Sequence, residues 1–345
     1  MASTRRSRAI GIVLAASMLS FGFGSSVQAR TSAHPARLTA VTLQLKWVPQ
    51  AQFAGYYVAL DKGFYRAEGL DVTIKPGGPQ IAPEEVVQSG GADFGIDWLS
   101  ALLTSRDVGL NLQNIAQIYQ ATGMRMIAFK STGINAIRKF AGHTVGVWPS
   151  GNQYQFYALM HKVGMAPPQK YMSVVTEGFT MTDFLDHHLD VAHAMTYNEL
   201  GVVLENGVKL NQLNVFDYNK LGVSILEDGI FGKSDWLKSH KDIAVRFLRA
   251  SIKGWNWAVA HPNQAGTISF RHTQAGTTTL FHQIYMAQQV AKLIHYGPGL
   301  MHTIGYMDPV AFHRTWGTLY RENVIHHPAN SAAYTQVYWK AAGGH

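Results

Sequence analysis

The N-terminal half of the chain alternates between two hydrophobic periods. Residues 38–45 place Val41, Leu43 and Leu45 at every second position, as a half-buried strand does, whereas apolar residues in 52–67 recur at helical spacing. Strands are expected again at 70–74 and 92–96, with a helix at 82–89 between them. Strands alternating with helices across short loops predict an α/β architecture with a largely parallel sheet.

The same pattern restarts further along the chain. Strands are expected at 126–129, 144–147, 172–175 and 191–194, with helices at 152–163 and 180–187. Beyond residue 225 longer helices follow at 234–240, 241–259, 279–295 and 308–322, as in a chain that returns to brace its first part. We therefore predict two α/β lobes with a cleft between them: lobe 1 at 38–128, lobe 2 at 129–222, and a return to lobe 1 at 223–345.

The N-terminus has the pattern of an export signal. Arg5, Arg6 and Arg8 precede an apolar run at 9–19, and small residues at 27 and 29 frame a cleavage site. The run is shorter than the roughly 20 apolar residues of a transmembrane helix. Residues 1–29 are predicted to be a signal peptide, by either the general or the twin-arginine route, and the mature protein is predicted to be periplasmic.

Composition removes several classes of function. The formal net charge of +8 is spread along the chain without a basic run, so no nucleic-acid surface is expected. The absence of cysteine excludes disulfides, thiolate metal sites and a lipid-modified N-terminal cysteine. The 16 histidines form no metal-binding motif, so we expect no metal.

Four segments, in order, carry a family resemblance: residues 43–74, 86–98, 184–199 and 247–265. They resemble the NMT1/THI5-like group of ABC-transporter substrate-binding proteins. The resemblance implies a type II periplasmic-binding fold, with two α/β lobes joined by a hinge and closing over a solute. It also implies a monomeric receptor that has no cofactor and delivers a small molecule to an ABC transporter permease in the inner membrane.

Candidate ligand-binding residues follow the expected strands, because ligands of α/β sheets sit beyond the carboxyl ends of strands. Aromatic faces can stack on a flat ring, and amide side chains offer both donors and acceptors. Trp47 could instead pack beneath its own loop, and Asp97 could instead cap the next helix. At most one of Tyr56 and Tyr57 should reach the ligand. The candidates are Trp47, Gln50, Gln52, Tyr56, Asp97, Trp98, Ser150, Gly151, Asn152, Tyr154, Tyr197, Asn198 and Glu199.

These positions are rich in aromatic and amide groups and poor in Arg and Lys. They favour a neutral heteroaromatic solute, such as a thiamine pyrimidine precursor or riboflavin. The family also includes receptors for alkanesulfonate, taurine and nitrate, so an anionic solute is the alternative.

Two other functions compete. The family includes a thiamine pyrimidine synthase, but its pyridoxal-phosphate lysine aligns with Asp97 and its histidine with Ala101. Its cysteine-rich iron motif has no counterpart in the region 225–231, since the chain has no cysteine. We therefore expect no enzyme and no catalytic residues. A sensory module built on the same clamp is the third possibility, although no signalling domain is apparent.

Overall fold

A computed structural model describes residues 37–149 and 151–345 of the chain. The signal peptide expected at 1–29 and the candidate Ser150 lie outside the described residues. No helix within the described part is both long and apolar enough to cross a membrane.

The first sheet has the strand order β2-β1-β3-β10-β4. β1 pairs in parallel with β2 and β3, whereas β10 runs antiparallel to both β3 and β4. Its strands are β1 (Thr39–Gln44), β2 (Leu70–Lys75), β3 (Phe94–Trp98), β4 (Leu112–Gln117) and β10 (Asp228–Lys233).

The second sheet has the order β7-β6-β8-β5-β9. β6 pairs in parallel with β7 and β8, and β5 is antiparallel to β8 and β9. Its strands are β5 (Met124–Phe129), β6 (Thr144–Val147), β7 (Ser173–Thr176), β8 (Val191–Met195) and β9 (Leu213–Asp217). The two predicted α/β lobes are therefore confirmed, each with a mixed sheet rather than a largely parallel one.

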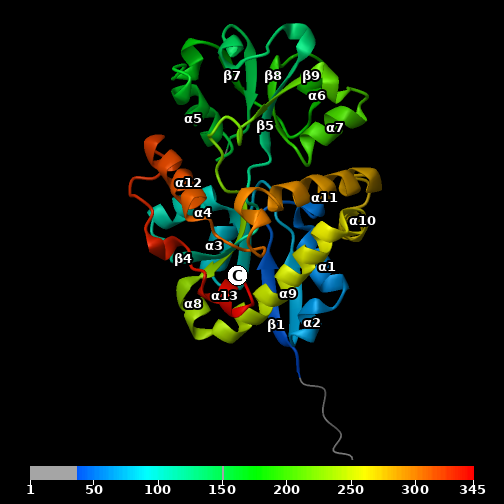
Figure 1. Cartoon of the computed structure of the whole chain (residues 1–345), viewed down its shortest axis with the longest axis vertical. Helices are drawn as coiled ribbons and strands as arrows, with labels where there is room; N and C mark the ends of the chain where they lie inside the picture. The colour runs from blue at the N-terminus through cyan, green and yellow to red at the C-terminus, as the bar shows by residue number, and fades with distance from the viewer. Residues whose placement is uncertain (1–36, 150) are drawn as a thin grey trace, which may run out of the picture. The chain divides into compact units, whose positions relative to one another are not determined.

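Helices surround each sheet (Figure 1). The second lobe has α5 (Tyr154–Lys162), α6 (Thr182–Leu185) and α7 (Glu199–Glu205). The first lobe has the 3-10 helix η1 (Ala51–Phe53) and α1 (Ala54–Asp61), α2 (Phe64–Ala67), α3 (Pro83–Gln88), α4 (Leu99–Asp107), α8 (Ser234–Ser239), α9 (Lys241–Ala260), α10 (Pro262–Phe270), α11 (Leu280–Ile294), α12 (Pro309–Arg321) and α13 (Val337–Ala341).

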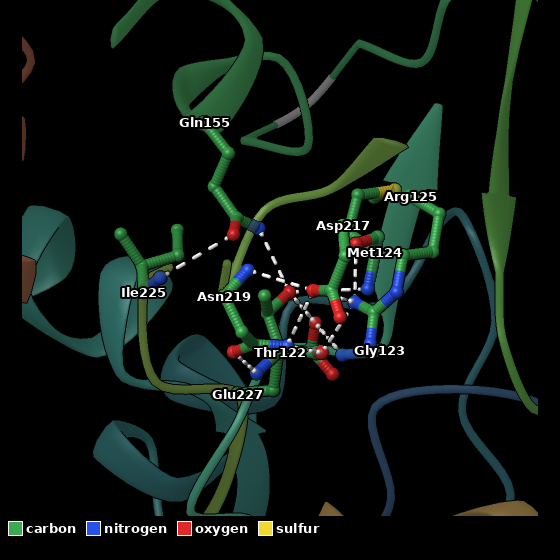
Figure 2. Close-up of polar contacts among 9 residues, drawn as sticks. All are labelled: Thr122, Gly123, Met124, Arg125, Gln155, Asp217, Asn219, Ile225 and Glu227. Atoms are coloured by element: carbon green, nitrogen blue, oxygen red, sulfur yellow. Dashed lines mark hydrogen bonds and ion pairs between the residues drawn. The ribbon is translucent and has the colours of Figure 1, made fainter. Parts of the chain in front are cut away.

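Two segments carry the chain between the sheets, one from β4 to β5 and one from β9 to β10. A buried polar network joins them (Figure 2). The Asn219 side chain donates to the Thr122 carbonyl at 2.9 Å and accepts from the Thr122 backbone N–H at 3.2 Å. Glu227 accepts from the Thr122 hydroxyl and, at 2.8 Å, from the Gly123 backbone N–H. The network therefore joins the two connecting segments to each other, at the place where a hinge between the lobes is expected.

Several element boundaries differ from the sequence prediction. The crossing into the second lobe precedes β5, so that lobe begins before residue 124 rather than at 129. The helix expected over 52–67 is divided into η1, α1 and α2, and the break between α1 and α2 falls at Gly63, which adopts a left-handed conformation with φ of 70°. The helix expected at 241–259 ends as α9 at Ala260, and a further helix, α10, begins at Pro262, whose missing N–H is not needed in a first turn.

Candidate functional site

A cavity of about 520 Å³ lies at the carboxyl ends of the parallel strands of both sheets. Segments that follow β1, β2 and β3 form one wall, and segments that follow β6, β7 and β8 form the other. This is the location expected for ligands of open α/β sheets. Its aromatic lining residues are Trp47, Trp98, Trp148, Tyr154, Phe179 and Tyr197.

The structure brings nearly all of the predicted residues to this cavity. Those that line it are Trp47, Gln50, Gln52, Asp97, Trp98, Gly151, Asn152, Tyr154, Tyr197, Asn198 and Glu199. Tyr56 does not line it, which corrects the prediction. The Tyr56 ring is buried on α1 and packs edge-on against Trp255 of α9, with ring centroids 5.3 Å apart.

A charged cluster forms part of the first-lobe wall. The Lys46 ammonium lies 2.5 Å from Asp97 Oδ1 and 5.1 Å from the centroid of the Trp98 ring. The buried Glu84 carboxyl is nearby, and its pKa is raised well above its usual range by burial and then by the charge of Asp97. Asp97 does not cap α4, because its carboxylate accepts from the Trp98 backbone N–H at 2.6 Å.

Amide side chains form another part of this wall. Gln50 Nε2 donates to Gln52 Oε1 at 2.8 Å, and Gln52 Nε2 donates to Asp228 Oδ2 at 2.9 Å. The backbone carbonyl of Gln52 accepts from the Tyr119 hydroxyl at 2.8 Å. Both amides are therefore held in place before any ligand arrives.

In the second lobe, Asn198 and Glu199 form a linked pair after β8. Asn198 Nδ2 donates to Glu199 Oε1 at 2.7 Å, and Glu199 Oε2 accepts from the Met195 backbone N–H at 3.0 Å. Burial raises the pKa of Glu199 to about 7. A ring nitrogen of His282, on first-lobe helix α11, lies 2.8 Å from Asn198 Oδ1, so this pair also contacts the opposite lobe.

Aromatic side chains from both lobes meet at the cavity. The Phe179 side chain is 63% exposed, and its ring centroid lies 5.3 Å from that of Trp47. The Trp148 indole donates to the Gly178 carbonyl at 2.8 Å, which anchors the segment that carries Phe179. The Trp148 backbone N–H donates to His193 Nδ1 at 3.1 Å, so a buried imidazole supports this wall from behind.

Among the lining residues that were not candidates, four have a charged or aromatic side chain: Lys46, Glu84, Trp148 and Phe179. Glu84 lies beyond the end of β2 and Phe179 beyond the end of β7. The strand-end rule that identified the other candidates would have found both, had it been applied to these edge strands as well. Lys46 directly precedes the candidate Trp47, and Trp148 lies two residues before the candidate Ser150.

The chain is similar in sequence to two solute-binding proteins and to a synthase. It is 27% identical over 256 residues to the riboflavin-binding protein RibY of Chloroflexus aurantiacus, covering 72% of this chain and 71% of that protein. It is 22% identical to the formylaminopyrimidine-binding protein of Halalkalibacterium halodurans, covering 77% and 81%. A 4-amino-5-hydroxymethyl-2-methylpyrimidine phosphate synthase of Uromyces fabae is 24% identical, with 64% and 67% covered.

Among solved structures, a putative periplasmic sulfonate-binding protein of Methylobacillus flagellatus superposes with a TM-score of 0.68. It is 12% identical, and the match covers 89% of this chain and 94% of that one. The likeness confirms the two-lobed periplasmic-binding fold. The family model described as NMT1/THI5 like matches residues 50–265, well over half of the 345 residues, and the chain therefore belongs to the NMT1/THI5-like family.

Proposed function

We propose that the protein is an exported solute-binding receptor of an ABC importer and that it captures a neutral heteroaromatic solute, a thiamine pyrimidine precursor or riboflavin. The observation that supports this most directly is the aromatic cavity between the lobes. Its volume of about 520 Å³ lies within the roughly 300–1,000 Å³ usual for small-molecule sites. Flat aromatic faces from both lobes suit a ring that is enclosed when the lobes close.

The charges on the cavity wall disfavour an anion. Lys46 is the one basic side chain among the described lining residues, and it is paired with Asp97. Glu84 and Glu199 add carboxyl groups to the same cavity. A sulfonate or nitrate would meet these groups without an unpaired cation to neutralise it.

The named relatives point the same way. RibY is named for riboflavin and the Halalkalibacterium protein for a formylaminopyrimidine, and both compounds contain a nitrogen heteroaromatic ring. Identities of 27% and 22% support this class of ligand without choosing between its members.

A synthase function has less support in the cavity. A Schiff base forms on a neutral amine. Burial acts to lower the pKa of Lys46, but the charge and hydrogen bond of Asp97, with the charges of Glu84 and Asp228, raise it on balance, so the amine is held as an ammonium. Lys46 is also the one lysine among the described lining residues. We therefore propose a receptor rather than an enzyme.

Export and docking complete the proposal. The N-terminal residues 1–29 would direct the chain to the periplasm, where a monomer would present its closed form to an inner-membrane permease.

The ligand can be identified by thermal stabilisation. The purified protein, refolded to remove any bound solute, is scanned with aminopyrimidines, thiamine, riboflavin, taurine, alkanesulfonates and nitrate. A ligand present at about 100 times its dissociation constant adds about 2.7 kcal/mol to the free energy of unfolding. We expect a response to an aminopyrimidine or to riboflavin.

The Trp47→Ala variant should lose that response. Trp257→Ala is the matched control, because Trp257 is a half-buried tryptophan on α9 that does not line the cavity. A response only to sulfonates or nitrate would contradict the heteroaromatic assignment, and equal binding by both variants would contradict the stacking role of Trp47.

A further inference from the structure

A chain of three polar side chains leads from the cavity into the protein interior. Gln50 and Gln52 line the cavity, whereas Asp228, the first residue of β10, lies behind them and is only 2% exposed. Gln52 Nε2 lies 2.9 Å from Asp228 Oδ2 and 3.2 Å from Oδ1, and no other described side chain donates to this carboxyl group.

The carboxyl group determines the orientation of both amides. An ionised carboxylate only accepts hydrogen bonds, so it requires the NH₂ group of Gln52 to face it. The Gln52 carbonyl then points to Gln50 and accepts from Gln50 Nε2 at 2.8 Å. The Gln50 carbonyl is left as the group that can accept a hydrogen bond from a ligand.

A protonated Asp228 has the opposite requirement, because its O–H must donate. The acceptor within reach is the Gln52 carbonyl, which faces Asp228 once the Gln52 amide is reversed. The Gln52 NH₂ group then points to Gln50 and is satisfied by the Gln50 carbonyl. Gln50 in turn presents its own NH₂ group to the cavity.

Both protonation states of Asp228 are accessible near neutral pH. Burial, followed by the charge of the neighbouring Glu227, raises the pKa of Asp228 to about 8. The hydrogen bond from Gln52 and the Lys46 ammonium act to lower this pKa, and the carboxylate of Asp97 acts to raise it. The buried hydroxyls of Tyr56, Tyr119 and Tyr197 complete its titratable surroundings.

We propose that Asp228 is a positioning residue that decides which group Gln50 presents to the ligand, its carbonyl when Asp228 is ionised and its NH₂ group when Asp228 is protonated. The inference rests on the proposed function only for the identity of the ligand. By linkage, a ligand whose edge donates a hydrogen bond favours the ionised form and releases a proton, and a ligand whose edge accepts one favours the protonated form.

The first test needs no ligand. In protein labelled with ¹⁵N at glutamine side chains, the Gln50 and Gln52 amide resonances are assigned with Gln50→Ala and Gln52→Ala and followed from pH 6 to 9. We expect both resonances to shift with one common midpoint. Asp228→Asn should abolish both shifts, and Gln52→Met should abolish that of Gln50 while Asp228 is intact.

Glu227→Gln is the matched control, since it removes the adjacent buried carboxyl and keeps Asp228. It should lower the common midpoint and retain both shifts. A Gln50 resonance that does not follow Asp228 would overturn the proposal, as would a transition that survives in Asp228→Asn.

The second test measures specificity. The probes are 4-amino-5-hydroxymethyl-2-methylpyrimidine and its 4-oxo counterpart, which have the same ring and a reversed hydrogen-bonding edge. Between pH 7 and 9 their affinities should change in opposite directions. Each affinity should change by up to about tenfold per pH unit in the range where the protonation state of Asp228 that the probe requires is the minor one. In Asp228→Asn these opposite trends should disappear.

The two tests separate the two hypotheses. If neither probe binds the wild-type protein, the pyrimidine assignment fails, and the amide resonances still decide the role of Asp228. If both probes bind with parallel pH profiles, the switch is refuted although the receptor function stands.

Discussion

Lys46 illustrates how the cavity holds charge at the scale of a single residue. Its ammonium lies 2.5 Å from a carboxylate that is almost fully buried, and Lys46 follows β1 whereas Asp97 lies near the end of β3. A buried charge that loses its partner is strongly destabilising, whereas loss of the whole pair is tolerated far better. Lys46 and Asp97 should therefore behave as one unit in stability as well as in binding.

This coupling can be measured with a double-mutant cycle. Lys46→Met should lower the free energy of unfolding by about 3 kcal/mol, because the Asp97 carboxylate is left without its cation. The double variant Lys46→Met/Asp97→Asn should lose less than the sum of the single changes. Denaturant unfolding of the four proteins gives the coupling energy.

Lys238→Met serves as the exposed control, since Lys238 reaches Asp235 only at 3.8 Å on the surface. It should change stability by no more than about 1 kcal/mol. If the effects of Lys46→Met and Asp97→Asn on the free energy of unfolding are additive, the two side chains have no coupling energy and the prediction is wrong.

Residue-level prediction from the sequence succeeded where local position determines the environment. Trp47, Trp98 and Tyr197 follow or end strands, so the strand-end rule placed them at the cavity. Tyr56 was misassigned because the face of α1 that is buried depends on α9, which is remote in sequence. Asp228 was missed for the same reason, since its contact with Gln52 joins residues 176 positions apart.

At the scale of elements, the return of the chain to lobe 1 was predicted, but the strand β10 with which it rejoins the first sheet was not. β10 inserts between β3 and β4, antiparallel to both, and all its residues from Asp228 to Gly232 are buried. Fully buried strands lack the apolar and polar alternation that marks a strand at a surface. The insertion places Glu227 at the crossing and Asp228 behind the cavity wall, in contact with Gln52.

The carboxyl group of Glu227, together with the side chain of Asn219, joins the two segments that carry the chain between the sheets. Glu227 accepts from Thr122 and Gly123, while its Oε2 atom is buried without a partner (Figure 2). Arg125 lies in the same network but bonds to backbone carbonyls and to Asp217 Oδ1 at 3.2 Å. Burial raises the pKa of Glu227 to about 7, so ionisation above neutral pH has a cost in the folded protein.

Glu227→Gln should relieve this cost. The variant amide keeps an oxygen for Thr122 and Gly123 and removes the charge, so it should unfold at a higher temperature than the wild type at pH 8.5. At pH 5.5, where the native carboxyl is protonated, the difference should be smaller or reversed. Thermal unfolding at both pH values checks this, and an equal difference at both would contradict a role for Glu227 ionisation.

At the scale of the whole molecule, buried carboxyl groups in both lobes determine how stability depends on pH. Burial raises the pKa of Glu177 to about 9, and the pKa values of Asp228, Glu199 and Glu227 are raised to about 8, 7 and 7. Each group binds more protons folded than unfolded at any pH between its ordinary pKa and its raised pKa. The free energy of unfolding therefore falls as pH rises through those intervals.

His193 acts in the opposite sense over a narrower range. It is buried, and burial lowers its pKa to about 3, so the folded state binds fewer protons than the unfolded state up to about pH 6.5. The contribution of His193 to the free energy of unfolding therefore rises with pH from about pH 3 to 6.5 and is constant above pH 6.5. These four carboxyl groups and Glu84, whose pKa is raised well above its usual range by burial, oppose this single imidazole, so the carboxyl groups set the net slope, most clearly between pH 6.5 and 8.

The ligand-free protein should consequently be more stable near pH 5 than at pH 8, which denaturant unfolding at fixed temperature across pH 4–9 can measure. Glu177→Gln should reduce the fall in the free energy of unfolding by up to about 1.4 kcal/mol per pH unit, because one titrating group is removed. The glutamine keeps an oxygen that can accept from the His193 backbone N–H, as Glu177 Oε2 does at 2.8 Å. The exposed Glu85→Gln should leave the slope unchanged. A free energy of unfolding that rises from pH 6.5 to 8 would mean that these carboxyl groups are ionised in the folded protein, and the proton-dependent role of Asp228 would then lose its basis as well.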